Sequence, residues 1–203
     1  MHDAPPIIIR SLTGSDARRH LDDVAALRIA VFRDWPYLYA GDMDYERDYL
    51  AAYAASPRSV FVLAFEAGRV VGASTGLPLA DDGPAFRAPF VARGQDPSQV
   101  FYFGESVLLP QYRGSGIGRA FFDHREAHAH RLGGFGWTAF AAVERDPQDP
   151  RRPAGHHGHE SLWAQRGYTR RPELAMTLDW TEAGVGDCSH ALTFWTRPLE
   201  ATT

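Results

Sequence analysis

One stretch of the chain limits its fold more than any other. Residues 108–129, LLPQYRGSGIGRAFFDHREAHA, join an apolar run to a helical pattern through a turn with three glycines, Gly114, Gly116 and Gly118. A strand that turns into a helix leaves the amides of the first helical turn unpaired, and glycine lets a ligand approach them closely. The helix dipole adds about half a positive charge there, and Arg113 and Arg119 add full ones. The stretch therefore predicts a diphosphate site. A tight turn that binds no ligand is compatible with the same sequence.

Two common nucleotide motifs fit this turn poorly. A P-loop requires a lysine after its last glycine, but all 21 basic residues of the chain are arginines. A dinucleotide fingerprint requires the spacing G-x-G-x-x-G, whereas the turn has G-x-G-x-G and no clear ribose-binding acid follows it. The anion at this turn is therefore expected to belong to another class of ligand.

Size, composition and charge narrow the class of protein further. The chain has 203 residues, of which 44% are hydrophobic, and no stretch marks a linker, so we expect one domain spanning residues 1–203. No apolar stretch approaches the roughly 20 residues of a membrane span, and the first residues lack the pattern of a signal peptide. We therefore expect a cytoplasmic protein without a membrane partner. A net charge of −4 with dispersed arginines argues against a nucleic-acid partner.

Metal binding is not expected from the sequence. Cys188 is the only cysteine, which excludes an internal disulfide and a thiolate-rich metal site. His124 and His128 lie one helical turn apart with Glu126 between them, but the zincin pattern needs a glutamate directly after the first histidine, where this chain has Arg125. Exposed histidines on a helix explain the pattern better, so we expect no metal.

The spacing of apolar residues predicts a mixed order of strands and helices, β-α-α-β-β-β-α-β-α-β-β. Asp16 and Asp44 are the expected N-caps of the first two helices, and the polar stretch 80–99 is expected to be a long loop. The strands are expected within residues 7–12, 59–65, 69–77, 100–109, 137–144, 174–180 and 190–199, and the helices within residues 14–35, 45–56, 119–133 and 159–167.

The segment SVLLPQYRGSGIGRAFF, residues 106–122, resembles the acyl-CoA loop of the GNAT superfamily of N-acetyltransferases, whose pattern is [QR]-x-x-G-x-[GA]. The late family motif Y-x-x-x-G-[FY] has a relative in WAQRGY, residues 163–168, and the order of elements also matches. Three longer stretches are similar to one bacterial branch of the superfamily. The resemblance implies an α/β (α+β) fold, in which helices flank a mixed, mostly antiparallel sheet with a splayed strand pair that binds acyl-CoA.

The same resemblance implies a co-substrate and the residues that bind it. Acetyl-CoA would donate an acetyl group to a primary amine of a small molecule or a peptide, in a monomer or a homodimer. The pantetheine arm would lie along the end of the fourth strand, and the pyrophosphate would lie in the glycine turn. The residues implied are Ser106, Val107 and Leu108 for the arm, and Arg113, Gly114, Ser115, Gly116, Ile117, Gly118 and Arg119 for the pyrophosphate.

The chemistry needs a group that removes a proton from the acceptor. A lysine-like amine has a pKa of about 10, and only its neutral form attacks a thioester. Glu105 is the first candidate for the base, because members of the family often use an acid on this strand; a buried structural carboxylate is the alternative. If a bulge shifts the strand, Tyr102 would face the pocket instead.

The general acid of the family is a tyrosine that opens the late motif, where this chain has Trp163. An indole cannot donate that proton, although a thiolate leaving group with a pKa near 8.5 needs little help. Tyr168 or the histidines of the loop before it, His156, His157 and His159, are possible substitutes. Trp163 also leaves open a second function, a non-catalytic acyl-CoA-binding or sensing module.

Aromatic residues between the first two helices are the candidates for the acceptor pocket, namely Phe32, Trp35, Tyr37 and Tyr39. They lie beside Asp42, Asp44 and Asp48 in the sequence, and aromatic walls with carboxylates suit an amine. Aromatics that pack under a helix hairpin, with acids that cap the second helix, explain the same pattern.

Overall fold

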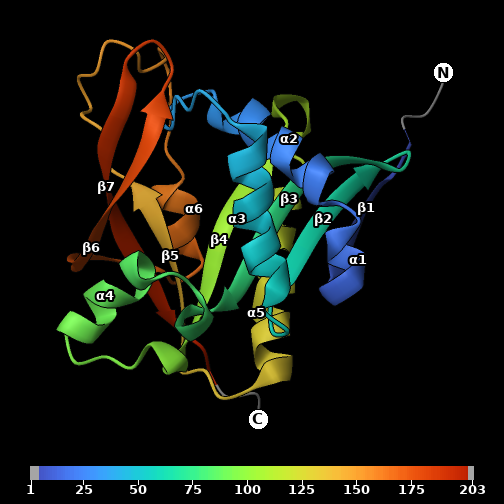
Figure 1. The fold of residues 1–203 in the computed structure, drawn as a ribbon, viewed down its shortest axis with the longest axis vertical. Helices are drawn as coiled ribbons and strands as arrows, with labels where there is room; N and C mark the ends of the chain where they lie inside the picture. Colours follow the sequence, from blue (N-terminus) through green and yellow to red (C-terminus); the bar gives the residue numbers. More distant parts are fainter. Residues whose placement is uncertain (1–4, 201–203) are drawn as a thin grey trace. The chain divides into compact units, whose positions relative to one another are not determined.

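The computed structural model describes residues 5–200 and shows a mixed α+β fold (Figure 1). The strands are hydrogen-bonded in the order β1-β2-β3-β4-β5-β7-β6, and this mostly antiparallel sheet confirms the predicted fold class. Strands β4 and β5 are the parallel pair. The strands are β1 (Ile7–Leu12), β2 (Val60–Glu66), β3 (Arg69–Pro78), β4 (Val100–Leu108), β5 (Trp137–Val143), β6 (Thr169–Glu182) and β7 (Gly186–Pro198). The helices are α1 (Gly14–Arg18), α2 (Leu21–Phe32), α3 (Met43–Ala55), α4 (Pro84–Ala92), α5 (Ile117–Leu132) and α6 (Glu160–Gln165).

The chain forms two compact units, and the strand β4 begins in one and ends in the other. Unit 1 consists of residues 1–31, 42–77 and 103–133, and unit 2 consists of residues 32–41, 78–102 and 134–203. Each unit is assembled from three separate segments, so no single cut of the chain would separate them. The expectation of one domain over residues 1–203 stays a prediction.

Unit 1 is built on the antiparallel strands β1, β2 and β3. Strand β2 pairs with β1 from Phe61 to Glu66, and side chains on both of its faces are buried, as its apolar sequence VFVLAF requires. Helix α5 packs against β2, and its apolar face places Ile117 and Phe121 in the core. This packing fixes the position of the first turn of α5, where the glycine turn ends.

A buried arginine ties three elements of unit 1 together. Arg125 on α5 is 1% exposed and donates hydrogen bonds to the backbone oxygens of Phe121, Thr75 and Glu105, each at 3.2 to 3.3 Å. Its guanidinium lies 4.3 Å from the ring centroid of Phe103. These contacts join α5 to β3 and to β4. The hydrogen bonds offset the cost of removing the charged guanidinium from water.

Unit 2 is built on the antiparallel strands β5, β7 and β6. The hairpin of β6 and β7 keeps its register from Ala175↔Thr193 to Glu182↔Gly186, after a bulge between Arg171 and Ala175. The first residues of β4 run parallel to β5, and helix α4 packs against β6. The hairpin is longer than the sequence predicts, because both strands extend toward the turn between Glu182 and Gly186.

Three local predictions are wrong, each for a physical reason. The first predicted helix is divided into α1 and α2 by a turn at Arg19 and His20. The N-cap of α3 is Asp42, whose side chain accepts from the amide of Tyr45, so Asp44 lies in the first turn instead. Asp16 likewise lies in the first turn of α1, after the N-cap Thr13.

The stretch 80–99, predicted as a long loop, contains α4 between two short 3₁₀ turns. Pro84 stands in the first turn of α4, where its missing amide hydrogen costs nothing. Pro89 lies inside the helix, whose hydrophobic side packs Phe90 into the core. The prolines and glycines that indicate a loop in the sequence are therefore overruled by tertiary packing.

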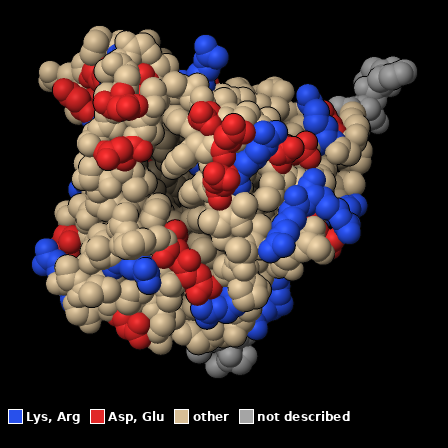
Figure 2. Space-filling view, viewed as in Figure 1, with Lys and Arg blue, Asp and Glu red and all other residues tan. Residues whose placement is uncertain are grey.

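Charged side chains of both signs lie next to one another over much of the face drawn in Figure 2. Arg47, for example, pairs with Asp22 at 2.8 Å and with Asp44 at 3.2 Å. Within residues 5–200, no helix has both the length and the apolar content to cross a membrane. The expectation that nucleic acids are not partners stays a prediction.

Candidate active site

The glycine turn predicted from the sequence forms the N-terminus of α5. After β4 ends at Leu108, a short 3₁₀ turn leads into Gly114 and Gly116, which have φ angles of 79° and 87°. Gly116 is the N-cap of α5. Both conformations are left-handed, which explains why glycine occupies these positions.

The backbone of this turn faces open space. A Cβ atom added at Gly114, Gly116 or Gly118 would meet no atom within 4 Å. The amides of Ile117 and Gly118 belong to the first helical turn and have no carbonyl one turn earlier in the helix. Exposed amides and the positive end of a helix dipole form a site for phosphate oxygens.

The side chains of the turn have different surroundings. Ile117 is buried, so only its backbone amide is available to a ligand. Arg113 and Arg119 are exposed, and Arg113 Nε donates to the backbone oxygen of Leu108 at 3.3 Å. Ser115 is exposed and its Oγ donates to the backbone oxygen of Tyr112 at 2.6 Å. Two arginines and the free amides thus give the turn a positive surface.

The predicted pantetheine residues are the last three residues of β4. Val107 is completely buried, so its side chain belongs to the core of unit 1 and its backbone alone is available. Ser106 is exposed and Leu108 is half-buried. The amide of Leu109 donates to the oxygen of Val71 on β3 at 3.1 Å, which holds this end of β4 in place. The splay of β4 from β5 and the contacts with the arm stay predictions.

Glu105 lies in a buried cluster with one arginine and a second glutamate. Arg28 Nη1 is 2.6 Å from Glu105 Oε2, and Arg28 Nε donates to Glu46 Oε2. The guanidinium also lies 4.4 Å from the ring centroid of Tyr49. The side chains of Glu105 and Glu46 are 3% and 1% exposed. One positive charge therefore faces two negative charges away from water.

The electrostatics of this cluster leave one carboxylate oxygen unsatisfied. Burial disfavours the charged form of Arg28, but the nearby carboxylates of Glu105 and Glu46 outweigh it and raise the pKa of Arg28 above its usual value. Both oxygens of Glu105 are buried without a hydrogen bond among residues 5–200, and Oε2 but not Oε1 has an ion-pair contact there, with Arg28. Such an orphan acceptor is costly unless a water or a ligand donates to it.

Tyr102, the alternative base, lies in a different environment. It is 4% exposed and belongs to unit 2, where its ring lies 5.3 Å from that of Phe86 and 6.0 Å from that of Phe194. Glu105 belongs to unit 1. Both catalytic assignments stay predictions, and the partners of Glu105 fit a base better than the apolar neighbours of Tyr102 do.

The aromatic residues predicted for the acceptor pocket pack on unit 2. The ring of Tyr37 lies 4.2 Å from that of Phe32 and 5.7 Å from that of Trp180. Tyr39 is buried and forms an isolated bridge with Glu182, and Trp35 lies half-buried near Arg145. Their packing favours the structural explanation, while their role toward an acceptor stays a prediction.

The residues considered as a general acid also have structural partners. Trp163 on α6 packs its ring 5.0 Å from that of Phe140 and 5.1 Å from that of Trp195. The hydroxyl of Tyr168, which is 3% exposed, forms a hydrogen bond of 2.9 Å with Thr138 Oγ1. His157 and His159 are exposed and His156 is half-buried.

Two of the histidines of α5, His124 and His128, are half-buried and buried, so the expectation of exposed helix histidines is wrong for this pair, while the absence of a metal stays a prediction. His124 Nδ1 shares a hydrogen bond of 2.8 Å with Ser11 Oγ, and His128 Nε2 lies 2.9 Å from the backbone oxygen of Arg58. Burial lowers the pKa of His128. Each ring thus has a partner of its own.

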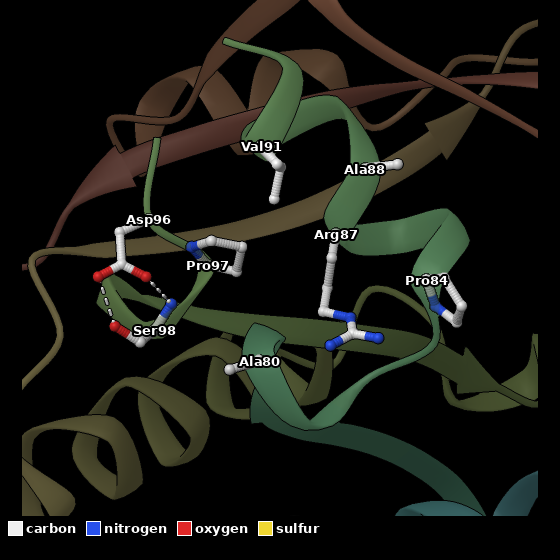
Figure 3. A pocket seen from close by; sticks show the side chains of 8 residues that line it. All are labelled: Ala80, Pro84, Arg87, Ala88, Val91, Asp96, Pro97 and Ser98. Atoms are coloured by element: carbon white, nitrogen blue, oxygen red, sulfur yellow. Dashed lines mark hydrogen bonds between the residues drawn. The ribbon is translucent and has the colours of Figure 1, made fainter. Parts of the chain in front are cut away.

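A hollow of about 430 Å³ opens on unit 2 beside α4 (Figure 3). Its wall is mostly apolar, and the guanidinium of Arg87 extends into it. Asp96 closes one side by accepting from the amide and the hydroxyl of Ser98 at 2.8 and 2.7 Å. None of the four aromatic residues predicted for the acceptor lines this hollow, so the hollow gives no support to the predicted acceptor site.

A family profile matches the part of the chain that contains these features. The profile described as "Acetyltransferase (GNAT) family" covers residues 25–154, which include Arg28, Glu105 and the glycine turn. No protein with a curated description matches the chain.

Solved structures are similar over nearly the full length of the chain. The N-acetyltransferase from Staphylococcus aureus Mu50 has a TM-score of 0.61 at 15% identity, with 96% of this chain and 99% of that chain covered. The ribosomal-protein-alanine N-acetyltransferase from Brucella melitensis has 0.60 at 16%, covering 94% and 99%. yncA from Salmonella typhimurium, solved with its cofactor acetyl-CoA, has 0.59 at 14%, covering 98% and 96%. At such low identities the likeness concerns the fold.

Proposed function

Because the chain belongs to the acetyltransferase (GNAT) family, we propose that it is an N-acetyltransferase, which moves the acetyl group of acetyl-CoA to a primary amine. The acceptor is a small molecule or a peptide. The family supports acetyl transfer in general, and the nature of the acceptor is our inference from the carboxylate cluster of unit 1.

The glycine turn supports acetyl-CoA as the donor. Its open amides at Ile117 and Gly118 and the side chains of Arg113 and Arg119 match the charge and size of a pyrophosphate. The structure of yncA contains acetyl-CoA on a similar fold. Glycines at positions 114, 116 and 118 keep the approach to the backbone free of side chains.

The observation that carries the amine acceptor is the unsatisfied, buried oxygen Oε1 of Glu105. An ammonium group, directly or through one water, supplies the hydrogen-bond donor that this oxygen lacks. Arg28 Nη1 lies 2.6 Å from the other oxygen, Oε2, and holds the carboxylate in place. Glu105 is therefore poised to accept a proton from the amine.

The proposed reaction balances as follows. Glu105 takes one proton from the ammonium, and the nitrogen lone pair forms a bond to the thioester carbonyl carbon. The tetrahedral intermediate collapses, the carbon–sulfur bond breaks, and the electron pair leaves with the sulfur of CoA. The second proton of the nitrogen goes to solvent, and the products are an amide and free CoA. A thiolate of pKa near 8.5 leaves without a strong general acid, so Trp163 is no obstacle to turnover.

A panel of amines tests the proposal through the release of free CoA thiol. Acetyl-CoA should raise the melting temperature, while NAD and ATP should raise it far less, because ligand binding to the native state stabilises by about 2.7 kcal/mol at a hundredfold excess over Kd. At least one amine should then release CoA thiol. If acetyl-CoA gives no stabilisation, the donor assignment is wrong.

A non-catalytic acyl-CoA-binding module is the second candidate, and Trp163 favours it. Its indole packs against Phe140 and Trp195 and offers no acidic proton to a leaving thiolate. Stabilisation by acetyl-CoA without thiol release for any amine, including peptides with free N-termini, would support this module over the enzyme.

A further inference from the structure

Three possible metal ligands meet on one face of the β6–β7 hairpin. The register pairs Trp180 with Cys188 and Leu178 with His190, and Glu182 lies two residues beyond Trp180. Residues that are paired or two apart share a face of a sheet. Glu182, Cys188 and His190 therefore project to the same side, although they are separated by the turn in sequence.

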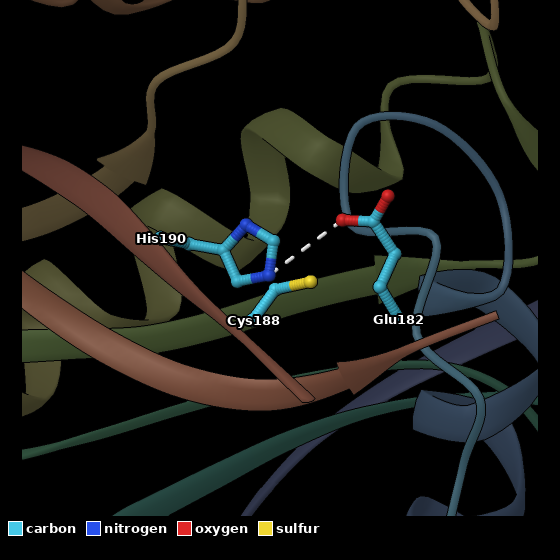
Figure 4. Close-up of side chains that lie close together, drawn as sticks. All are labelled: Glu182, Cys188 and His190. Atoms are coloured by element: carbon cyan, nitrogen blue, oxygen red, sulfur yellow. Dashed lines mark ion pairs between the residues drawn. The ribbon is translucent and has the colours of Figure 1, made fainter. Parts of the chain in front are cut away.

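Their ligand atoms converge (Figure 4). The carboxylate oxygen, the sulfur and the ring nitrogen all lie within 4.8 Å of one another, and His190 Nε2 is 3.6 Å from Glu182 Oε2. A tetrahedral zinc ion with bonds of about 2.1 Å to nitrogen and oxygen and about 2.3 Å to sulfur separates its ligand atoms by roughly 3.3 to 3.6 Å. The 3.6 Å between His190 Nε2 and Glu182 Oε2 falls at the upper end of this range, and the three ligand atoms lie no more than 4.8 Å from one another.

The imidazole of His190 is buried and stacked, and its inner nitrogen forms no hydrogen bond. The residue is 6% exposed, and Nε2 has no hydrogen bond among residues 5–200, since its contact with Glu182 Oε2 is 3.6 Å long. The ring stacks on Trp180 with centroids 3.6 Å apart and planes 14° apart, and Trp180 Nε1 donates to the oxygen of Tyr37. A buried nitrogen without a hydrogen bond, next to a thiol and a carboxylate, has room for a metal ion as its partner.

We propose that Glu182, Cys188 and His190 bind a divalent cation of the zinc class. Thiolate and imidazole ligands select zinc over magnesium or calcium, which prefer oxygen. Three protein ligands leave one coordination position for water. Binding forms bonds from the metal to the carboxylate oxygen, the thiolate and Nε2, and releases the thiol proton of Cys188 to solvent.

Two arginines on Glu182 oppose the cation, and their charges are largely compensated. Arg145 Nη1 lies 2.9 Å from Oε2, and Arg151 Nη1 contacts Oε1. Arg151 is also paired with Asp149 at 2.6 Å, and the thiolate of Cys188 adds a negative charge when the metal binds. A carboxylate has about four lone-pair positions, so one arginine on each oxygen leaves room for a metal.

The single cysteine makes the site easy to follow in solution. Cobalt(II) added to the metal-free protein should give a sulfur-to-cobalt charge-transfer band in the near ultraviolet, because Cys188 is the only source of thiolate. Zinc(II) should remove this band and should slow the reaction of the thiol with a disulfide reagent about tenfold or more, since a coordinated thiolate is a poor nucleophile.

Variants separate this site from other histidines. Cys188→Ser should abolish the cobalt band, and His190→Gln should weaken zinc binding by about tenfold or more. His157→Gln, in an exposed loop with three histidines, is the matched control and should leave both signals unchanged. Zinc that neither slows the thiol reaction nor depends on His190 would overturn the proposal, and circular dichroism of each variant shows that the fold is intact. None of these measurements depends on acetyl transfer.

Discussion

The two units of the molecule treat their buried glutamates in opposite ways. In unit 1, Glu105 shares one arginine with Glu46 and keeps one oxygen without a donor. In unit 2, Glu182 receives one arginine on each oxygen. A carboxylate with one oxygen that no arginine contacts is suited to accept a proton, whereas one with an arginine on each oxygen is suited to hold strands and loops together.

The neighbours of Glu182 confirm this structural duty. Arg145 also donates to the backbone oxygens of Pro36 and Tyr37, at 2.6 and 2.9 Å. The segment 32–41 is thereby fixed to the end of β6. Both glutamates are buried and paired with arginine, so these two properties do not by themselves identify a catalytic glutamate, and our proposal depends on the oxygen of Glu105 that no arginine contacts.

The sharpest test of the comparison is Glu105→Gln. The amide keeps the shape of the side chain but cannot accept the proton, so turnover should fall by about a hundred- to ten-thousand-fold at neutral pH. Affinity for acetyl-CoA should hardly change. The remaining rate should rise as the pH approaches the pKa of the acceptor amine, because the amine is then neutral without the help of a base. Release of CoA thiol measured against pH gives the answer, with exposed Glu160→Gln as control. Wild-type rates at all pH values would assign the base elsewhere, with Tyr102 next.

Glu182→Gln should act on stability. Removal of the charge leaves Arg145 and Arg151 without their shared carboxylate, and breaking a buried ion pair costs about 3 to 5 kcal/mol. The free energy of unfolding from urea denaturation, with a chelator present to exclude metals, measures this loss. An equal loss in the Glu160→Gln control would show that the arginines are not the cause.

The pH dependence of stability sharpens the same contrast. Burial raises the pKa of Glu182, but Arg145 and Arg151 outweigh this effect and lower it below its usual value. A lowered folded-state pKa gives stability that is present above the unfolded pKa of about 4.3 and is lost as the pH falls through the folded pKa. The difference in unfolding free energy between wild type and Glu182→Gln should therefore shrink below pH 4. A constant difference down to pH 2 would contradict the assignment.

The smallest expected effect on stability comes from Gly118→Ala in the glycine turn. Gly118 is helical and a Cβ atom meets nothing there, so alanine should stabilise the helix by about 0.5 to 1 kcal/mol. The same methyl group should weaken acetyl-CoA binding, because it lies where phosphate oxygens approach. Gly136→Ala in unit 2, also with open space around it, should leave binding unchanged. Tighter or unchanged binding in Gly118→Ala would remove the turn from the donor site. Gly116 is unsuitable for this test, because any side chain is strained at its φ angle.

The sequence allowed the glycine turn to be predicted, because the motif is local: its glycines, the preceding strand and the following helix are consecutive. Glu105 could be proposed for the same reason, since it lies on the strand that leads into the turn. Its partners Arg28 and Glu46 could not, because they approach through the packing of α2 and α3.

The cluster of Glu182, Cys188 and His190 was missed because it depends on strand length and register. The sequence predicts strands at 174–180 and 190–199, which exclude both Glu182 and Cys188. In the structure β6 and β7 extend to Glu182 and Gly186, and their pairing brings Cys188 and His190 to the carboxylate. Nothing in the spacing of these residues along the chain indicates which face of the hairpin they share.

The guanidinium of Arg125 links the two halves of the proposed reaction mechanically. A single nitrogen, Nη1, donates to the oxygens of Thr75 and Glu105, while Nε donates within α5. The guanidinium of Arg125 thus connects α5, which begins at the glycine turn, with β4, which carries Glu105. Because Arg125 contacts both elements, its substitution should disturb the start of α5 and the backbone of Glu105 together.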